Sequence, residues 1–158
     1  MASKNTIGSK IVIEGEKEYN ESLRRIRAEQ QELRSEMNLC TETYKENANT
    51  VEALKQKQEI LAKQVDAQSR KVENQRRVLE SANKAQEEAK NRIEKYQEAL
   101  SGAEKELERM KSAADTSAEA IEAQKKEIED LNSKLILFQQ GYDKAEAASV
   151  KYQTALNN

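Results

Sequence analysis

The residues of this chain that could do chemistry are mainly its carboxylates, of which there are 29. Paired carboxylates can act as a general acid and a general base, but they need a pocket that shifts their pKa values. Histidine is absent, so the most common catalytic base and metal ligand is missing. The sequence also contains no CxxC motif, phosphate-binding loop or GxGxxG motif. These patterns predict no enzyme activity, no metal and no cofactor.

The remaining reactive or charged groups also point away from catalysis and nucleic-acid binding. Cys40 is the single cysteine, so no internal disulfide can form. The formal net charge is −2, and acidic and basic residues are interleaved. The densest basic cluster, which we expect to be a solvated helix face, consists of Arg70, Lys71, Arg76 and Arg77. We therefore expect no nucleic-acid partner for this segment.

The composition indicates which elements carry these side chains. Charged residues make up 35% of the chain and aromatic residues only 4%, which is too little apolar bulk for an ordinary globular core. Low hydrophobicity and high charge could also mean disorder. However, proline is absent while Ala, Glu, Lys, Gln and Leu dominate, as in long helices and coiled coils. On extended helices, the carboxylates would face water rather than a pocket.

A heptad repeat supports the coiled-coil interpretation. With Leu23 at position a and Ile26 at position d, the register continues without a slip from Tyr19 to Leu156. No a or d position in this stretch is charged, and all five Tyr residues and the one Phe occupy such positions. We call these a and d positions the seam. Its predicted apolar residues are Leu23, Ile26, Leu33, Met37, Val51, Leu54, Leu61, Val65, Val72, Leu79, Ile93, Leu100, Leu107, Ile121, Ile128 and Leu131.

The predicted fold is an elongated all-α coiled coil with a short amino-terminal β-strand. An unbroken helix of about 140 residues would be roughly 210 Å long. Three sites could interrupt it, and a helical hairpin would use them as corners: 47–50, with Asn49 as a helix cap and Glu52 behind it; 101–102, with Gly102; and 114–117, with Asp115, Thr116 or Ser117 as a cap.

The sequence indicates self-association but leaves the number of copies and the helix direction open. The β-branched residues at several a positions favour a parallel dimer, whereas small and apolar g positions favour three or more helices. Parallel pairing would join the opposite charges of Glu29 with Arg34 and of Glu106 with Lys111, but it would also bring Lys71 against Arg76, which is repulsive. Such pairs are worth only a few tenths of a kcal/mol, so they do not fix the oligomer.

Two apolar clusters lie outside the regular pattern and are candidate docking elements for a partner. The first is Ile11, Val12 and Ile13, and the second is Leu135, Ile136, Leu137 and Phe138. Residues 10–14 read as a strand, which needs a partner for its amide groups. Gly15 could then cap a helix whose first turn holds Glu16 and Glu18. We therefore divide the chain into a strand and docking segment at 1–15 and a helical region at 16–158.

The beginning of the chain resembles a known family. Residues 7–39, "IGSKIVIEGEKEYNESLRRIRAEQQELRSEMNL", resemble the amino-terminal region of tail tape measure proteins from phages and prophages of Gram-positive bacteria. Residues 47–73, "NANTVEALKQKQEILAKQVDAQSRKVE", are similar to the segment that follows in that family. The rest of the chain matches only in being helical and charged.

The resemblance implies a structural role as a helical ruler, present in several copies, around which tail-tube subunits polymerise. It also implies three kinds of partner: the tail-tube protein, tail assembly chaperones and proteins at the tail ends. Assembly would take place in the host bacterial cytoplasm, and the final location would be the lumen of the virion tail. Members of the family are usually much longer, with hydrophobic segments that this chain lacks, so we expect an amino-terminal fragment or a short ruler.

Two other functions fit the same residues. A helical-hairpin adaptor or holdase would bind other proteins, and it predicts helix reversals at the three interruption sites together with exposed apolar tips. A generic cytoplasmic coiled-coil filament predicts self-association into long polymers. We find no signal peptide and no transmembrane run, which makes a reducing cytosol the expected place of folding.

Overall fold

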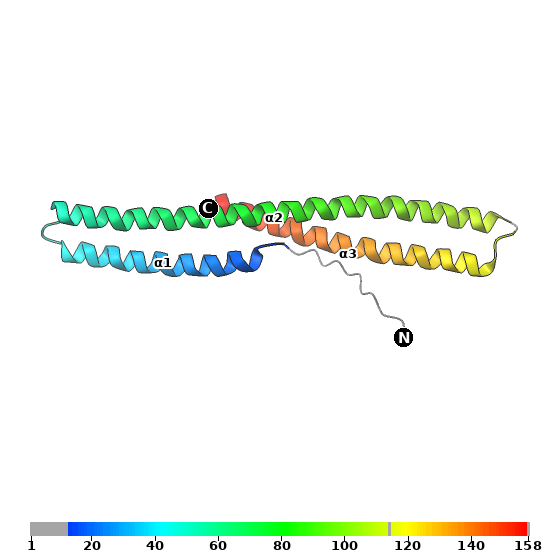
Figure 1. Cartoon of the computed structure of the whole chain (residues 1–158), viewed down its shortest axis with the longest axis horizontal. Coiled ribbons are helices and arrows are strands. Elements are labelled where there is room, and N and C mark those ends of the chain that lie inside the picture. The colour runs from blue at the N-terminus through cyan, green and yellow to red at the C-terminus, as the bar shows by residue number, and fades with distance from the viewer. Residues whose placement is uncertain (1–12, 114, 158) are drawn as a thin grey trace, which may run out of the picture. The chain divides into compact units, whose positions relative to one another are not determined.

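The computed structural model describes residues 13–113 and 115–157, and this part of the chain is all-α. It contains three helices: α1 (Glu16–Thr43), α2 (Val51–Ser112) and α3 (Ala118–Asn157) (Figure 1). The predicted all-α class is thereby confirmed. No strand occurs among the described residues. The predicted strand at 10–14 lies mostly outside them, and Ile13 and Glu14 are in an irregular segment and a turn.

The start of α1 follows from a glycine and two acidic residues. Gly15 precedes the helix with φ 79° and ψ 1°, a left-handed conformation that residues with a Cβ rarely adopt. Its carbonyl oxygen accepts a hydrogen bond from the Tyr19 amide at 2.8 Å. Glu16 and Glu18 lie in the first turn, where the helix dipole favours negative charge. The expected helix start after Gly15 is therefore found.

Two of the three predicted interruptions separate helices. Residues 44–50 connect α1 to α2, and residues 113–117 connect α2 to α3. The Thr50 hydroxyl accepts a hydrogen bond from the Ala53 amide at 3.3 Å, and the Ser117 hydroxyl accepts one from the Ala120 amide at 3.2 Å. The first cap corrects the sequence prediction, because Thr50 and not Asn49 satisfies the free amide at the start of α2.

The third predicted interruption, at 101–102, is wrong. Gly102 lies inside α2, and the helix continues for another ten residues to Ser112. A glycine in a helix interior costs only about 1 kcal/mol relative to alanine. The good helix formers around it, "EALSGAEKEL", outweigh that cost.

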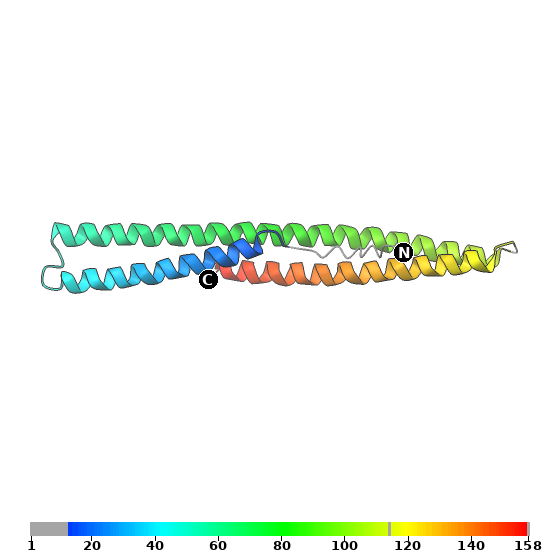
Figure 2. The same cartoon turned by 60° about the horizontal axis from the view of Figure 1, so that its bottom comes forward.

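The described chain divides into two compact units, and the first consists of Glu14–Glu80 with Tyr152–Asn157. In it, α1 and the first part of α2 run antiparallel, side by side in both views (Figures 1 and 2). Three pairs show this direction, since residue numbers fall in α2 as they rise in α1: Ser22 with Asn74, Glu29 with Arg70, and Glu36 with Lys63. Near the connection, Leu33, Cys40 and Ile60 form a buried cluster, and Met37 and Tyr44 pack against it.

The second unit contains residues 81–151, which comprise the second part of α2 and most of α3. These helices are also antiparallel. Asn83 accepts a hydrogen bond from Ser149, and Ala103, further along α2, accepts one from Gln124, earlier in α3. The buried residues on the α2 side of this unit are mostly small: Ala82, Ala85, Ala89, Ile93 and Ala103. Alanine at these positions lets two helices approach closely with little side-chain interlock.

Candidate interaction surfaces

The seam predicted from the heptad repeat is used differently along the chain. In α1, all four buried residues are d positions: Tyr19, Ile26, Leu33 and Cys40. In the first part of α2, however, the buried residues are Ala53, Ile60 and Ala67, which repeat every seven residues at position c. The first part of α2 therefore packs against α1 with a face other than its a and d positions.

The predicted seam residues fall into two groups. Twelve are buried or half-buried: Leu23, Ile26, Leu33, Met37, Val72, Leu79, Ile93, Leu100, Leu107, Ile121, Ile128 and Leu131. The other four lie together at the start of α2 and are exposed: Val51 is 76% exposed, Leu54 53%, Leu61 52% and Val65 66%. We call the a and d face of α2 from Val51 to Val72 the open stripe. Its remaining members are Gln58 and Gln68, so it carries no charge.

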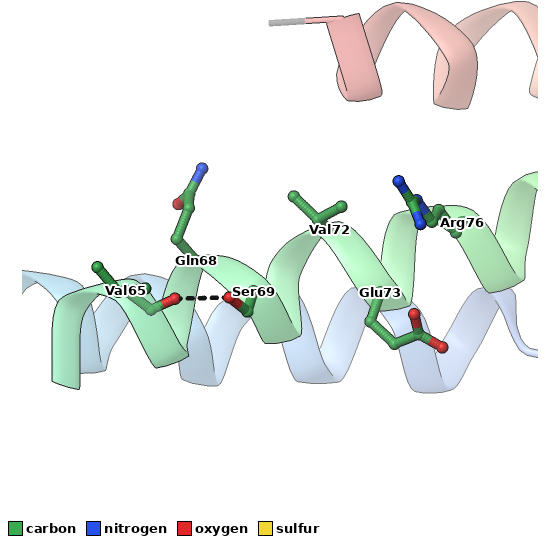
Figure 3. Close-up of a pocket in the computed structure, with 6 residues that line it drawn as sticks. All are labelled: Val65, Gln68, Ser69, Val72, Glu73 and Arg76. Carbon is green, nitrogen blue, oxygen red and sulfur yellow. Dashed lines mark hydrogen bonds between the residues drawn. The ribbon is translucent and has the colours of Figure 1, made fainter. Parts of the chain in front are cut away.

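A hollow marks one end of the open stripe. Its volume is about 380 Å³, and it is lined by Val65, Gln68, Ser69, Val72, Glu73 and Arg76 (Figure 3). Val65, Gln68 and Val72 project from the same side of α2 in this view. All the lining residues belong to α2, so the hollow is a surface feature of one helix and not an enclosed active-site pocket.

A tyrosine-centred cluster joins the carboxyl end of the described chain to α1 and α2 within the first unit. Tyr152 is fully buried, and its ring meets that of Tyr19 edge to face, with centroids 5.2 Å apart. The Tyr152 hydroxyl donates a hydrogen bond to Glu16 Oε1 at 2.8 Å. Buried Gln75 donates from Nε2 to the carbonyl oxygen of Ala155 at 3.0 Å. Burial, followed by the bond to Glu16, raises the pKa of Tyr152 above its ordinary value, because both disfavour the phenolate.

Aromatic packing also organises the second unit. The rings of Tyr96 and Phe138 stack with centroids 5.2 Å apart, and the Arg92 guanidinium lies 5.4 Å from the Phe138 centroid. A cation at this distance from an aromatic face is attracted to it. On the same unit, the Tyr142 hydroxyl accepts a hydrogen bond from Gln86 at 3.2 Å. Phe138, predicted as part of a docking element, is thus a packing residue.

The predicted docking elements are only partly presented at the surface. Ile136 is 59% exposed and Leu137 is 47% exposed, whereas Leu135 is half-buried and Phe138 is buried. Ile13 is half-buried, and Ile11 and Val12 lie outside the described residues. The exposed part of the second element is therefore a pair of adjacent aliphatic side chains on α3.

Two residues of the basic cluster expected to be a solvated helix face form ion pairs with neighbouring carboxylates. Arg70 contacts Glu29 at 2.6 Å and Asp66 at 2.9 Å, and these hydrogen bonds raise its pKa. Arg77 contacts Glu73 at 3.0 Å. Similarly, the hydrogen bond from Arg109 lowers the pKa of Glu106. Exposed pairs of this kind contribute little to stability.

The described part of the chain contains no group of His, Cys, Asp or Glu residues that could hold a metal ion. Within the same residues, no helix is long and apolar enough to cross a membrane. Every fully buried polar side-chain atom that the structure describes has a hydrogen-bond partner. The candidate surfaces are apolar contact faces, and the open stripe of α2 is one of them.

Sequence reasoning missed two features that only packing reveals. Ile60 lies off the heptad seam, so the repeat gives it no role, yet it is only 4% exposed and packs in the cluster with Leu33 and Cys40. The bond between Tyr152 and Glu16 joins residues 136 positions apart. The sequence does place Tyr19 and Tyr152 at d positions, which predicts that both are buried. It does not predict that they contact each other.

Comparison with protein-family models, curated proteins and solved structures finds no significant match to this chain.

Proposed function

We propose that this chain is a structural, non-catalytic part of a phage tail tape measure protein, corresponding to its amino-terminal region. The observation that carries the proposal is the resemblance of residues 7–39 to that family. The start of α1 at Glu16, directly after the glycine within this stretch, is consistent with the glycine–helix part of the resemblance. The helical content of α1, α2 and α3 suits a ruler, because each helical residue adds a fixed rise of about 1.5 Å.

The antiparallel helices within each unit bear on how such a ruler would work. Two helices packed side by side measure only about half the length of the same residues laid end to end. A ruler role therefore requires α1 to separate from α2, and α2 from α3. Small residues such as Ala82 and Ala89, and half-buried ones such as Ile121 and Ile128, give these contacts limited apolar burial. Contacts of this kind open at modest cost.

In the open state, we propose that the uncharged seam forms the predicted coiled coil between several copies. The a and d positions of all three helices, including the open stripe of α2, would then be buried against other copies. The proposed partners are the tail-tube subunits, the assembly chaperones and the tail-end proteins. The proposed location is the tail lumen, after assembly in the host bacterial cytoplasm.

A second function, a helical-hairpin adaptor or holdase, is favoured by a specific observation. The chain reverses direction at 44–50 and at 113–117 within its two units, and Ile136 and Leu137 are exposed. A binding module would use the closed hairpins themselves and would need no open state. The generic filament has no comparable support, since it predicts long polymers formed by the chain alone.

Binding to a tail-tube subunit separates these functions. We expect the chain to co-purify with the tube subunit encoded in the same phage or prophage, and not with unrelated unfolded proteins. Val12→Asp and Ile136→Asp should each weaken this binding, because both place a carboxylate in a proposed docking element. Gln140→Asp adds the same charge at an exposed position of α3 and should leave binding unchanged. Equal binding to any unfolded protein would instead establish the holdase.

A further inference from the structure

The ends of α1 and α3 that lie farthest from their connections to α2 meet in one cluster within the first unit. Residues 44–50 join the carboxyl end of α1 to α2, and residues 113–117 join α2 to the amino end of α3. The opposite ends of α1 and α3 are not joined to α2 by a connection. Instead, Tyr152 near the end of α3 contacts Glu16 and Tyr19 in the first turn of α1.

This contact is buried, unlike the ion pairs between α1 and α2. Tyr152 is 0% exposed and Tyr19 is 8% exposed. In the ion pair of Arg70 with Glu29, by comparison, the two side chains are 46% and 38% exposed. A solvated ion pair contributes little to stability, whereas a buried hydroxyl that loses its acceptor keeps the full cost of its burial. Breaking the tyrosine contact is therefore the more costly of the two.

Two adjacent residues of α2 bind the same two helix ends. Asn74 donates a hydrogen bond from Nδ2 to the hydroxyl oxygen of Ser22 in α1 at 2.6 Å. Gln75, the one buried polar residue in the part of the chain that the structure describes, donates to the carbonyl oxygen of Ala155 at 3.0 Å. The last four carbonyls of a helix have no amide partner within it, and Ala155 is among them because α3 ends at Asn157. Gln75 therefore supplies a donor that α3 itself lacks at this end.

We propose that these contacts form a lock that makes the far ends of α1 and α3 open together. The lock is the set of three hydrogen bonds that join Tyr152 to Glu16, Gln75 to Ala155 and Asn74 to Ser22. These bonds tie the three helices in pairs: α3 to α1, α3 to α2, and α1 to α2. If either outer helix leaves, the other loses one of its two partners, so departure of the first promotes departure of the second.

The consequence of the lock for assembly rests on the proposed function. A ruler requires α1 and α3 to separate from α2, and the lock sets the fraction of chains in which their far ends have done so. The apparent affinity of a protein for its partner scales with the fraction in the binding-competent form. The lock would therefore regulate how readily the chain enters a tail tube.

Hydrogen exchange of the full chain measures this opening. A helix that leaves its packing partners frays in water, so its amides exchange. In the wild-type chain, we expect residues 22–26 of α1 and residues 148–152 of α3 to show the same free energy of opening. That value should be lower than the value for residues 33–40, which lie beside the connection between α1 and α2.

Two variants test whether the opening is joint. Gln75→Met removes the donor to α3 at similar side-chain size, and Ser22→Ala removes the acceptor on α1. Each loses about one hydrogen bond, so each should raise exchange about fivefold at both 22–26 and 148–152. Tyr44→Phe removes a hydroxyl near the α1–α2 connection and should raise exchange at neither segment. Circular dichroism verifies that all three variants remain helical.

The decisive result is the effect of each variant on the helix that it does not touch. A rise confined to 148–152 in Gln75→Met, or to 22–26 in Ser22→Ala, would show that the two ends open independently and would overturn the lock. Equal opening free energies for both ends and for residues 33–40 would also overturn it, because the ends would then open only when the whole unit unfolds.

Co-sedimentation with polymerised tube protein is a separate readout. If the lock regulates assembly, Gln75→Met should reach half-maximal binding at about a fivefold lower concentration than wild type. An unchanged concentration would remove the role of the lock in assembly. A wild-type chain that does not bind tube protein would remove the tail role, while the exchange pattern would still decide whether the lock exists.

Discussion

At the scale of single residues, Gly15 and Gly102 should respond in opposite ways to substitution by alanine. Gly15 has a positive φ at the start of α1, and Gly102 lies in a regular turn of α2 with no atom within 4 Å of where a Cβ would be. We expect Gly15→Ala to lower the free energy of unfolding by about 1 kcal/mol, because alanine is strained in the left-handed region. Gly102→Ala should raise it by about 0.5–1 kcal/mol, since alanine has less conformational freedom to lose.

Urea unfolding followed by circular dichroism measures both changes at matched concentrations. The two variants make the same chemical change, so each is the control for the other. Stabilisation by both would show that the left-handed conformation of Gly15 does not matter. Destabilisation by both would show that the helix is not continuous through Gly102.

Tyr152 predicts a pH dependence at the alkaline end. Its pKa is raised in the folded chain, so the folded state holds the phenolic proton more tightly than the unfolded state. The resulting stabilisation is complete below about pH 10, the ordinary pKa of tyrosine, and it is lost as the pH rises from there towards the folded pKa. Tyr152→Phe should flatten the fall in stability above pH 10. At pH 7 it should cost about 1 kcal/mol, through loss of the bond to Glu16.

The measurement is the thermal midpoint between pH 7 and 11 for wild type and variant. Tyr44→Phe serves as the matched control, because Tyr44 is half-buried near the α1–α2 connection and no hydrogen bond from its hydroxyl is found among the described residues. Parallel pH curves for wild type and Tyr152→Phe would show that another group controls alkaline stability.

At the scale of elements, the two faces of α2 differ sharply between neighbouring residues. Ile60 is 4% exposed against α1, whereas Leu61 is 52% exposed on the open stripe. We expect Ile60→Ala to cost about 2–4 kcal/mol, because it leaves a cavity beside Leu33 and Cys40. Leu61→Ala should cost less than about 1 kcal/mol, since it removes a side chain that is already largely in water.

Chemical denaturation of both variants at the same low micromolar concentration compares them. If Ile60→Ala and Leu61→Ala lowered the free energy of unfolding equally, Leu61 would be as buried as Ile60. The contact between α2 and α1 would then not be centred on the face that carries Ile60. A larger loss of stability for Leu61→Ala would indicate that α2 packs against α1 with its a and d face.

At the scale of the whole molecule, the same seam has two uses. Within the two units it packs helices of one chain together, except along the open stripe, where it is uncovered. The proposed coiled coil between copies would use the full seam, including the open stripe. Leu61→Glu should therefore impair assembly with tube subunits, because it places a carboxylate in the seam. Gln56→Glu adds the same charge at an exposed position outside the seam and should leave assembly unchanged, and co-sedimentation with polymerised tube protein measures the outcome.

Local and periodic signals in the sequence determined the helical class, the start of α1 after Gly15 and the connections near 47–50 and 114–117. Each of these depends on a few neighbouring residues: a glycine, a hydroxyl cap or the phase of uncharged positions. Such signals act over one or two turns, so they can be read without knowing what lies across the contact. The same reasoning wrongly predicted a helix interruption at Gly102, because a single glycine does not end a helix within a long run of good helix formers.

Only the tertiary structure decided which face of α2 packs against α1. The heptad repeat marks the a and d positions as uncharged, but small residues at Ala53 and Ala67 let α1 approach from another side, with Ile60 between them filling the contact. The pairing of Tyr152 with Glu16 and Tyr19 likewise depends on which helices meet. Periodicity specifies that a face is apolar. The partner of that face is set by close packing between segments that are far apart in the chain. A local repeat does not specify which distant segments meet.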